Sequence, residues 1–95
     1  MSALFGLGQV VATPGALDDL AANGQTAAEL ITRHVRGDFG DVCESDAQAN
    51  RQEIADGNGR VLSSYTLADG TKTWIITNIV DGEGVDSCIL RPSEY

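Results

Sequence analysis

Apolar positions change their spacing near the middle of the chain. Between residues 14 and 55 they recur mostly every three or four positions, which is typical of helices with one buried face. After residue 60 they alternate with polar residues or form short runs between glycine-containing turns, which is typical of strands. The pattern predicts a single small α+β domain over residues 1–95: a short N-terminal strand, two to three helices, then a three-stranded antiparallel meander.

Two helix starts carry capping residues. Thr13 can cap a helix, because its side chain can accept a hydrogen bond from a backbone amide of the first turn. The proline that follows is favourable at the first helical position, where a backbone amide would have no partner within the helix. Thr26 and Glu29 have the spacing of a capping box. We expect a short helix that ends at Asn23-Gly24 and a second, amphipathic helix that ends at Gly37.

A third helix is expected over residues 42–55, where apolar residues are so few that much of the helix must face solvent. Ser45 is a candidate cap for a later start of this helix. The glycine-containing residues 56–59 should end it.

The expected strands are residues 7–12, 60–67, 72–80 and 85–90. Asp69-Gly70 is a strong hairpin signal between the second and third of them. The third strand places Trp74 and Ile76 on one face and Ile75 and Ile79 on the other. We therefore expect it at the centre of the sheet, with helices on one side, and the first strand at an edge.

Net charge limits the classes of partner. Fourteen acids against six bases give −8, with a pI near 4.2. This balance disfavours direct binding to nucleic-acid phosphates or to an anionic membrane, and it favours a protein partner with a basic surface. No apolar segment approaches the roughly 20 residues of a membrane span, and no export signal is recognisable. We expect a soluble, cytoplasmic protein.

The negative charge concentrates in residues 38–59, which carry six acids and one base. The six acids are Asp38, Asp41, Glu44, Asp46, Glu53 and Asp56. Placed together on a surface element, they could occupy a basic groove that normally binds phosphates. The alternative is a solvated helix face whose first-turn acids are favoured by the helix dipole.

His34 and Cys43 have the residue types of a reactive site. His34 with Asp38 and Asp41 could bind a metal only if the three converge, and a histidine on an apolar helix stripe is more often a packed residue. Cys43 with His34 as base lacks a third residue, and acidic surroundings would raise the thiol pKa. We therefore predict no catalytic residue, no metal and no cofactor, and Cys43 and Cys88 as free thiols.

Three aromatic residues are expected to anchor the core: Phe39, Tyr65 and Trp74. The alternative is an exposed aromatic platform for a partner.

Three stretches of the sequence, residues 8–17, 34–41 and 65–77, together resemble a group of small uncharacterised bacterial proteins known only as "plasmid-related". Such proteins occur on plasmids, integrative elements and phages. The resemblance implies an accessory protein of a mobile element, and it implies no catalytic residue. Small acidic proteins of that origin are often inhibitors of host defence, of the anti-CRISPR or antirestriction type.

Charge and resemblance together predict a non-enzymatic inhibitor that binds a nucleic-acid-targeting defence complex by occupying its basic surface. The six acids of residues 38–59 would supply the charge complementarity. The alternative hypothesis is a non-enzymatic structural or regulatory module of a mobile element, a homodimer joined through its sheet.

Overall fold

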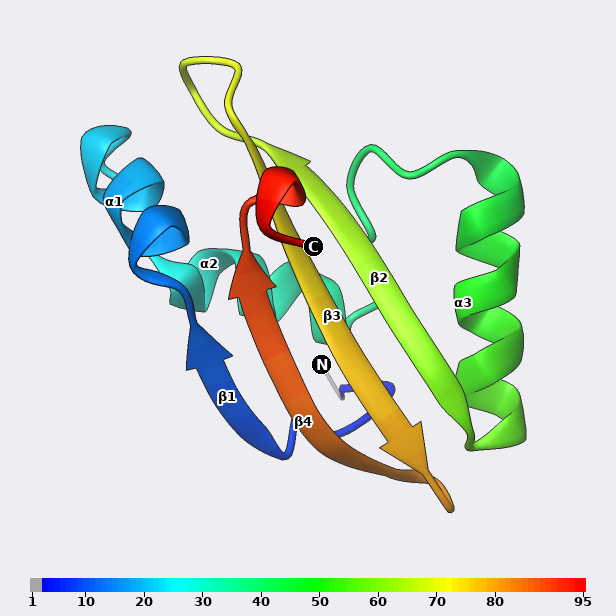
Figure 1. The fold of residues 1–95 in the computed structure, drawn as a ribbon. Helices are drawn as coiled ribbons and strands as arrows, with labels where there is room; N and C mark the ends of the chain where they lie inside the picture. Colours follow the sequence, from blue (N-terminus) through cyan, green and yellow to red (C-terminus); the bar gives the residue numbers. More distant parts are fainter. Residues whose placement is uncertain (1–2) are drawn as a thin grey trace.

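The computed structural model describes residues 3–95, which form a four-stranded sheet with helices behind it and along one edge (Figure 1). In chain order the elements are β1 (Gln9–Ala12), α1 (Pro14–Ala22), α2 (Ala27–Val35), α3 (Glu44–Asp56), β2 (Gly59–Thr66), β3 (Lys72–Val80), β4 (Glu83–Leu90) and a C-terminal 3-10 turn, η1 (Pro92–Glu94). The predicted α+β class is confirmed.

The strand order is β1-β4-β3-β2. Strands β2, β3 and β4 form the predicted antiparallel meander, and β3 is central. β1 joins at the edge as predicted, but it runs parallel to β4, so the sheet is mixed instead of a pure antiparallel meander. The alternation within a lone strand carries no information about which strand it will pair with, or in which direction.

Two glycines let the N-terminal segment cross close to β4 and set β1 beside it. A Cβ atom on Gly84 would lie 1.8 Å from the carbonyl oxygen of Gly6. Gly8 has φ +64, a left-handed conformation that costs glycine little. β1 begins at the next residue.

Helices α1 and α2 begin as predicted. The Thr13 hydroxyl accepts from the amide of Ala16 at 3.1 Å, and the Thr26 hydroxyl accepts from that of Glu29 at 3.3 Å. The prediction of Ser45 as a cap of α3 is wrong. Ser45 lies inside α3, and the residue before the helix makes no side-chain capping bond.

Helices α1 and α2 cover one face of the sheet, where most of the core lies. Its main cluster consists of Ala16, Leu20, Leu30, Tyr65, Leu67, Ile75 and Ile89. A second cluster consists of Phe5, Phe39, Val61 and Ile79, and Ala47 and Ile54 of α3 pack against it. The few apolar residues of α3 thus pack one face of that helix against the core.

Tyr65 and Phe39 are buried, as predicted for core anchors. Trp74 is only half-buried. Its neighbour Ile75 packs against α1 and α2, so Trp74 lies on the opposite face of the sheet. There its ring meets that of Tyr95 edge-on, with 5.7 Å between centroids. The prediction for Trp74 is therefore only partly right.

The outer edge of β2 is closed by α3. The side-chain amide of Asn50, itself 4% exposed, donates to the Leu62 carbonyl at 2.7 Å and accepts from the Leu62 amide at 3.1 Å. Glu53 accepts from the Arg60 amide at 2.8 Å. These side chains take the place of a neighbouring strand, which leaves little of this edge open for another chain.

The loop before α3 closes the rest of the same edge. The Ser64 amide donates to the Phe39 carbonyl at 3.0 Å, and the Asp41 amide donates to the Ser64 carbonyl at 2.7 Å. Residues 38–59 are therefore hydrogen-bonded along the outer edge of β2, at Arg60, Leu62 and Ser64.

Candidate functional site

Three of the six acids predicted as a binding patch are paired with bases of the same chain. The pairs are Asp38 with Arg33 (2.7 Å), Asp41 with Lys72 (3.2 Å) and Glu44 with Arg51 (2.9 Å). All three are largely exposed and contribute little to stability. Each of them nevertheless cancels negative charge where the sequence predicts an excess.

The pKa values of two of these carboxyls reflect the contacts. The hydrogen bond from Arg33 holds the pKa of Asp38 below its usual value. Hydrogen bonds from Thr66 and Lys72 do the same for the pKa of Asp41. Both carboxylates are therefore firmly ionised at neutral pH and already have donors within the chain.

The other three predicted acids lie along α3. Glu53 serves the β2 edge, and Asp56 accepts from Gln52 at 2.9 Å. The side chain of Asp46 makes no hydrogen bond or ion pair with the described residues. The predicted patch is thus divided into three acids with ion pairs, Asp38, Asp41 and Glu44, and three acids of α3 without ion pairs.

Further acids join the unneutralised part from the β3–β4 turn. The Gly82 amide donates to the Gly57 carbonyl at 2.7 Å, and the Asp81 amide donates to the Asn58 side chain at 3.2 Å. These contacts hold the β3–β4 turn against the C-terminal end of α3. The acids of the turn therefore lie near Asp56, the last residue of α3.

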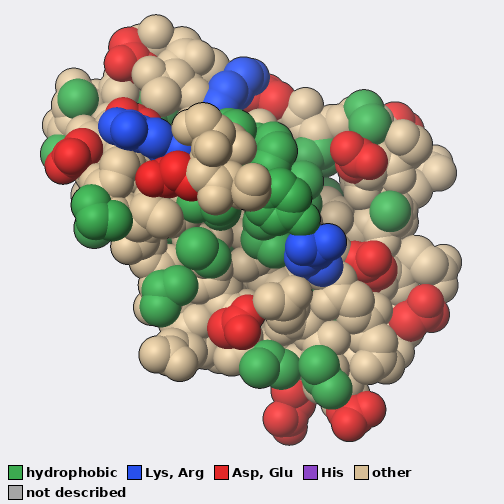
Figure 2. Space-filling model, viewed as in Figure 1, with side chains coloured by type: hydrophobic (Ala, Val, Ile, Leu, Met, Phe, Trp, Pro, Cys, Tyr) green, Lys and Arg blue, Asp and Glu red, His purple; other side chains and the backbone are tan. Residues whose placement is uncertain are grey.

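We call the resulting surface the acidic end. Its acids are Glu53, Asp56, Asp81, Glu83 and Asp86, and the base Arg60 lies beside Glu53. No ion pair within residues 3–95 involves any of the five. Figure 2 shows acidic side chains at the lower margin, where the β3–β4 turn lies, and along the right margin over α3.

The sequence patterns missed three of these five acids. Residues 81–86 carry three acids and no base, but they are separated from α3 by two strands. Only the contact between the two loops reveals that they belong together. Asp86 is also held in place by the Asn78 side chain, which donates to it at 2.6 Å.

His34 lies in the core and is fully buried. Its Nδ1 is 2.5 Å from the Ser63 hydroxyl, and its Nε2 is 2.9 Å from the Thr77 hydroxyl. The Thr77 hydroxyl is 2.7 Å from that of Ser87, which donates to the Leu7 carbonyl at 2.8 Å. This His34 network connects α2 with β2, β3, β4 and the N-terminal segment.

With a neutral imidazole, only one placement of protons satisfies all four bonds. Because Ser87 donates to a carbonyl, Thr77 must donate to Ser87, so His34 must donate to Thr77 from Nε2. Nδ1 then accepts from Ser63. Burial disfavours the charged imidazole and lowers the His34 pKa, so at neutral pH the ring is neutral, with its proton on Nε2 and both nitrogens hydrogen-bonded.

The two reactive interpretations of His34 do not fit this geometry. Asp38 and Asp41 are bound to bases, and no group of three metal-ligating side chains occurs in residues 3–95. Cys43 is exposed and contacts Ser45 at 3.2 Å, whereas both nitrogens of buried His34 face hydroxyl groups. Cys43 and Cys88 are free thiols, as predicted.

The burial of His34 has a measurable consequence, since burial lowers its pKa from 6.5 to about 4. Below pH 6.5 the unfolded chain binds a proton that the folded chain does not, so the free energy of unfolding falls as the pH falls. We expect a loss of about 2 kcal/mol between about pH 7 and pH 5, where carboxyl groups contribute little. Urea unfolding at both pH values measures it; a His34→Gln variant should lose this dependence, and an equal dependence in both proteins would contradict the assignment.

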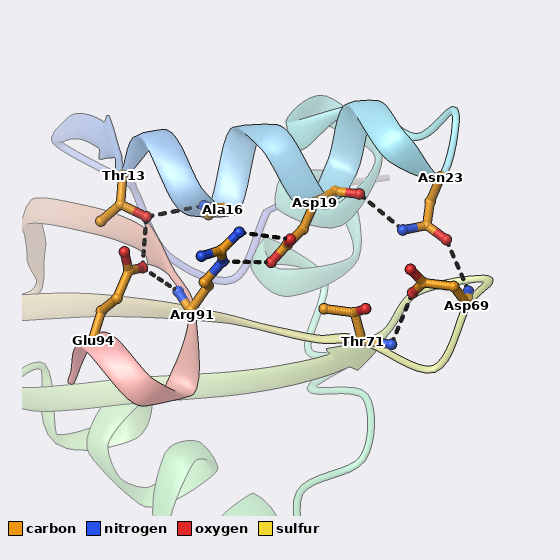
Figure 3. Close-up of polar contacts among 8 residues, drawn as sticks. All are labelled: Thr13, Ala16, Asp19, Asn23, Asp69, Thr71, Arg91 and Glu94. Atoms are coloured by element: carbon orange, nitrogen blue, oxygen red, sulfur yellow. Dashed lines mark hydrogen bonds and ion pairs between the residues drawn. The ribbon is translucent and has the colours of Figure 1, made fainter.

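A second polar cluster joins α1 to the C-terminal turn (Figure 3). Arg91 donates two hydrogen bonds to the Asp19 carboxylate, at 2.8 and 2.9 Å. Glu94 accepts from the Arg91 amide and from the Thr13 hydroxyl, both at 2.7 Å. A cleft of about 430 Å³ borders Arg91 and Asp19, but these two groups satisfy one another, so we assign the cluster a structural role.

No protein-family model, no curated protein and no solved structure matches this chain. The resemblance to plasmid-related proteins therefore stays a prediction. Within residues 3–95, no helix has the length and apolar character needed to cross a membrane.

Proposed function

We propose that this protein is a non-enzymatic binding module whose acidic end covers a basic, nucleic-acid-binding surface of a partner protein. One observation carries the proposal: five carboxylates from α3 and the β3–β4 turn share one end of the molecule without an ion pair among the described residues. Such a surface attracts a basic groove over several ångströms and repels phosphates.

The acids predicted from the sequence have unequal parts in this proposal. Asp56 and Glu53 belong to the acidic end, and Asp46 extends it along α3. Asp38, Asp41 and Glu44 contribute less, because a partner would first have to compete with their own bases.

The resemblance to proteins of mobile elements supports a particular class of partner, namely a subunit of a CRISPR or restriction complex in the cytoplasm of a bacterial host. The protein would inhibit the complex by occupying the site of its nucleic acid. This mode of action requires neither a cofactor nor a metal.

The first test is a pull-down with tagged protein from a bacterial lysate that contains CRISPR and restriction systems, at low and at high salt. We expect a defence-complex subunit at low salt and its loss at high salt, since exposed charges are screened over about 8–10 Å at physiological ionic strength and over about 3 Å at 1 M. Capture that does not change with salt, or the absence of any basic partner, would contradict the proposal.

The second candidate is a structural or regulatory module that forms a homodimer. The observation that favours it is the open edge of β1 at one side of the sheet (Figure 1). The two candidates use different surfaces and do not exclude each other.

A further inference from the structure

β1 is an edge strand whose outer side has no strand or side chain bonded to it among the described residues. The Thr13 amide donates to the Ile89 carbonyl, and a parallel ladder uses every second residue of each strand. Val11 therefore also bonds toward β4, whereas Val10 and Ala12 direct their amides and carbonyls away from the sheet. None of these four groups has a hydrogen-bond partner among the described residues.

The two edges of the sheet differ in whether their outward backbone groups have hydrogen-bond partners. The β2 edge is closed by Asn50, Glu53 and the loop before α3. β1 is short, with four residues, but it contains no charged residue and no proline, and no element among the described residues covers its outer side (Figure 1). Val10 and Val11 are 42% and 49% exposed. Such an edge is a template for strand addition.

Charge distribution indicates which strand can be added. Residues 1–17 contain no charged side chain, although the whole chain carries −8. Two copies of this chain repel each other over most of their surface, and β1 lies in the longest uncharged stretch that they could bring together.

The edge is also complementary to itself. In an antiparallel pair related by a two-fold axis through Val11, the outward groups of Val10 meet those of Ala12 in the second copy, and the reverse. All four open groups of each β1 are then paired. The two Val11 side chains face each other in a non-hydrogen-bonded pair, the closest arrangement across antiparallel strands.

We propose that a second copy of this chain binds at β1, joining two four-stranded sheets into one continuous eight-stranded sheet with Val11 at the two-fold axis. The contact is small, so the dimer is reversible and forms with increasing concentration. It does not depend on the acidic end, and the two proposals can fail separately.

The test uses single cysteines in a chain in which Cys43 and Cys88 are replaced by serine. Val11→Cys places two thiols across the axis, with Cα atoms about 4.5 Å apart, within the range of a disulfide. We expect most of this variant to become a covalent dimer under mild oxidation and to return to single chains with reductant.

Val10→Cys is the matched control, since Val10 is similarly exposed on the same strand. In the proposed dimer it lies opposite Ala12 of the second copy, so two copies of residue 10 are further apart than the roughly 7 Å limit for disulfides. We expect little covalent dimer. Equal cross-linking of the two variants, or none of Val11→Cys, would overturn the proposed pairing.

Analytical ultracentrifugation of the unchanged chain is the second measurement. We expect a mass that rises with concentration toward twice the 10.0 kDa of one chain. Val11→Lys, which places like charges across the axis, should stay at the mass of one chain with an unchanged circular dichroism spectrum. A single-chain mass of the unchanged protein at every concentration would overturn the proposal.

Discussion

Replacing His34 with alanine is expected to lower the free energy of unfolding by about 3–5 kcal/mol. The side chain is fully buried and stands edge-on to the ring of Phe5, so its loss leaves a cavity in the core. It also leaves the hydroxyls of Ser63 and Thr77 without their partner in a place that water does not reach. The change therefore combines lost packing with unpaired buried polar groups.

Urea unfolding monitored by circular dichroism measures this effect, with Thr32→Ala as the control. Thr32 is exposed on the same helix, and we expect its replacement to change the free energy of unfolding by only about 0.5 kcal/mol. Because small domains have only about 5–15 kcal/mol in total, a His34→Ala chain that unfolds at very low urea also agrees with the prediction. A loss below about 1 kcal/mol would contradict the His34 network.

Reversing charge at the acidic end is expected to abolish binding of the basic partner while the fold persists. Asp56→Lys with Glu83→Lys is a suitable pair, because both side chains are exposed and neither accepts a backbone hydrogen bond. Lysine at the last residue of α3 is favourable with the helix dipole. Glu53 is unsuitable, since it holds the Arg60 amide.

The matched control is Asp18→Lys with Glu29→Lys, two exposed acids on α1 and α2 that form no ion pair among the described residues. Each double variant gains four units of charge, so both go from −8 to −4. We expect an affinity loss of at least about 100-fold for the first pair, about 2.7 kcal/mol, and less than about 10-fold for the second. Equal losses would mean that net charge alone governs binding.

Local signals in the sequence predicted the helices and the meander well. A threonine cap acts on amides two or three residues away, so Thr13 and Thr26 indicate their helices without any knowledge of the fold. The apolar run Trp74–Ile76 likewise favours a central strand, and β3 lies between β2 and β4.

Features that depend on contacts distant in sequence escaped prediction. The two side-chain partners of His34 lie 29 and 43 residues further along the chain, and a histidine on an apolar stripe does not indicate which hydroxyls it will meet. The parallel pairing of β1 and the role of Asn50 as a substitute strand depend equally on tertiary structure. Ser45 failed as a cap because α3 begins one residue earlier.

The candidate site shows the same division. Composition correctly placed an excess of acids in residues 38–59, but it could not show that Arg33, Lys72 and Arg51 neutralise three of them. Nor could it show that the β3–β4 turn adds acids to the end of α3. The surface now proposed for binding is therefore shifted toward the end of α3 that leads into β2.

The most direct test of the proposed function is competition between this protein and nucleic acid for the captured partner. The purified partner is loaded with labelled nucleic acid, and the protein is added at increasing concentration while the bound label is measured. We predict that the label is released in step with binding of the protein, and that the Asp56→Lys/Glu83→Lys variant releases none. A stable complex that holds the partner, the protein and the nucleic acid together would contradict the account.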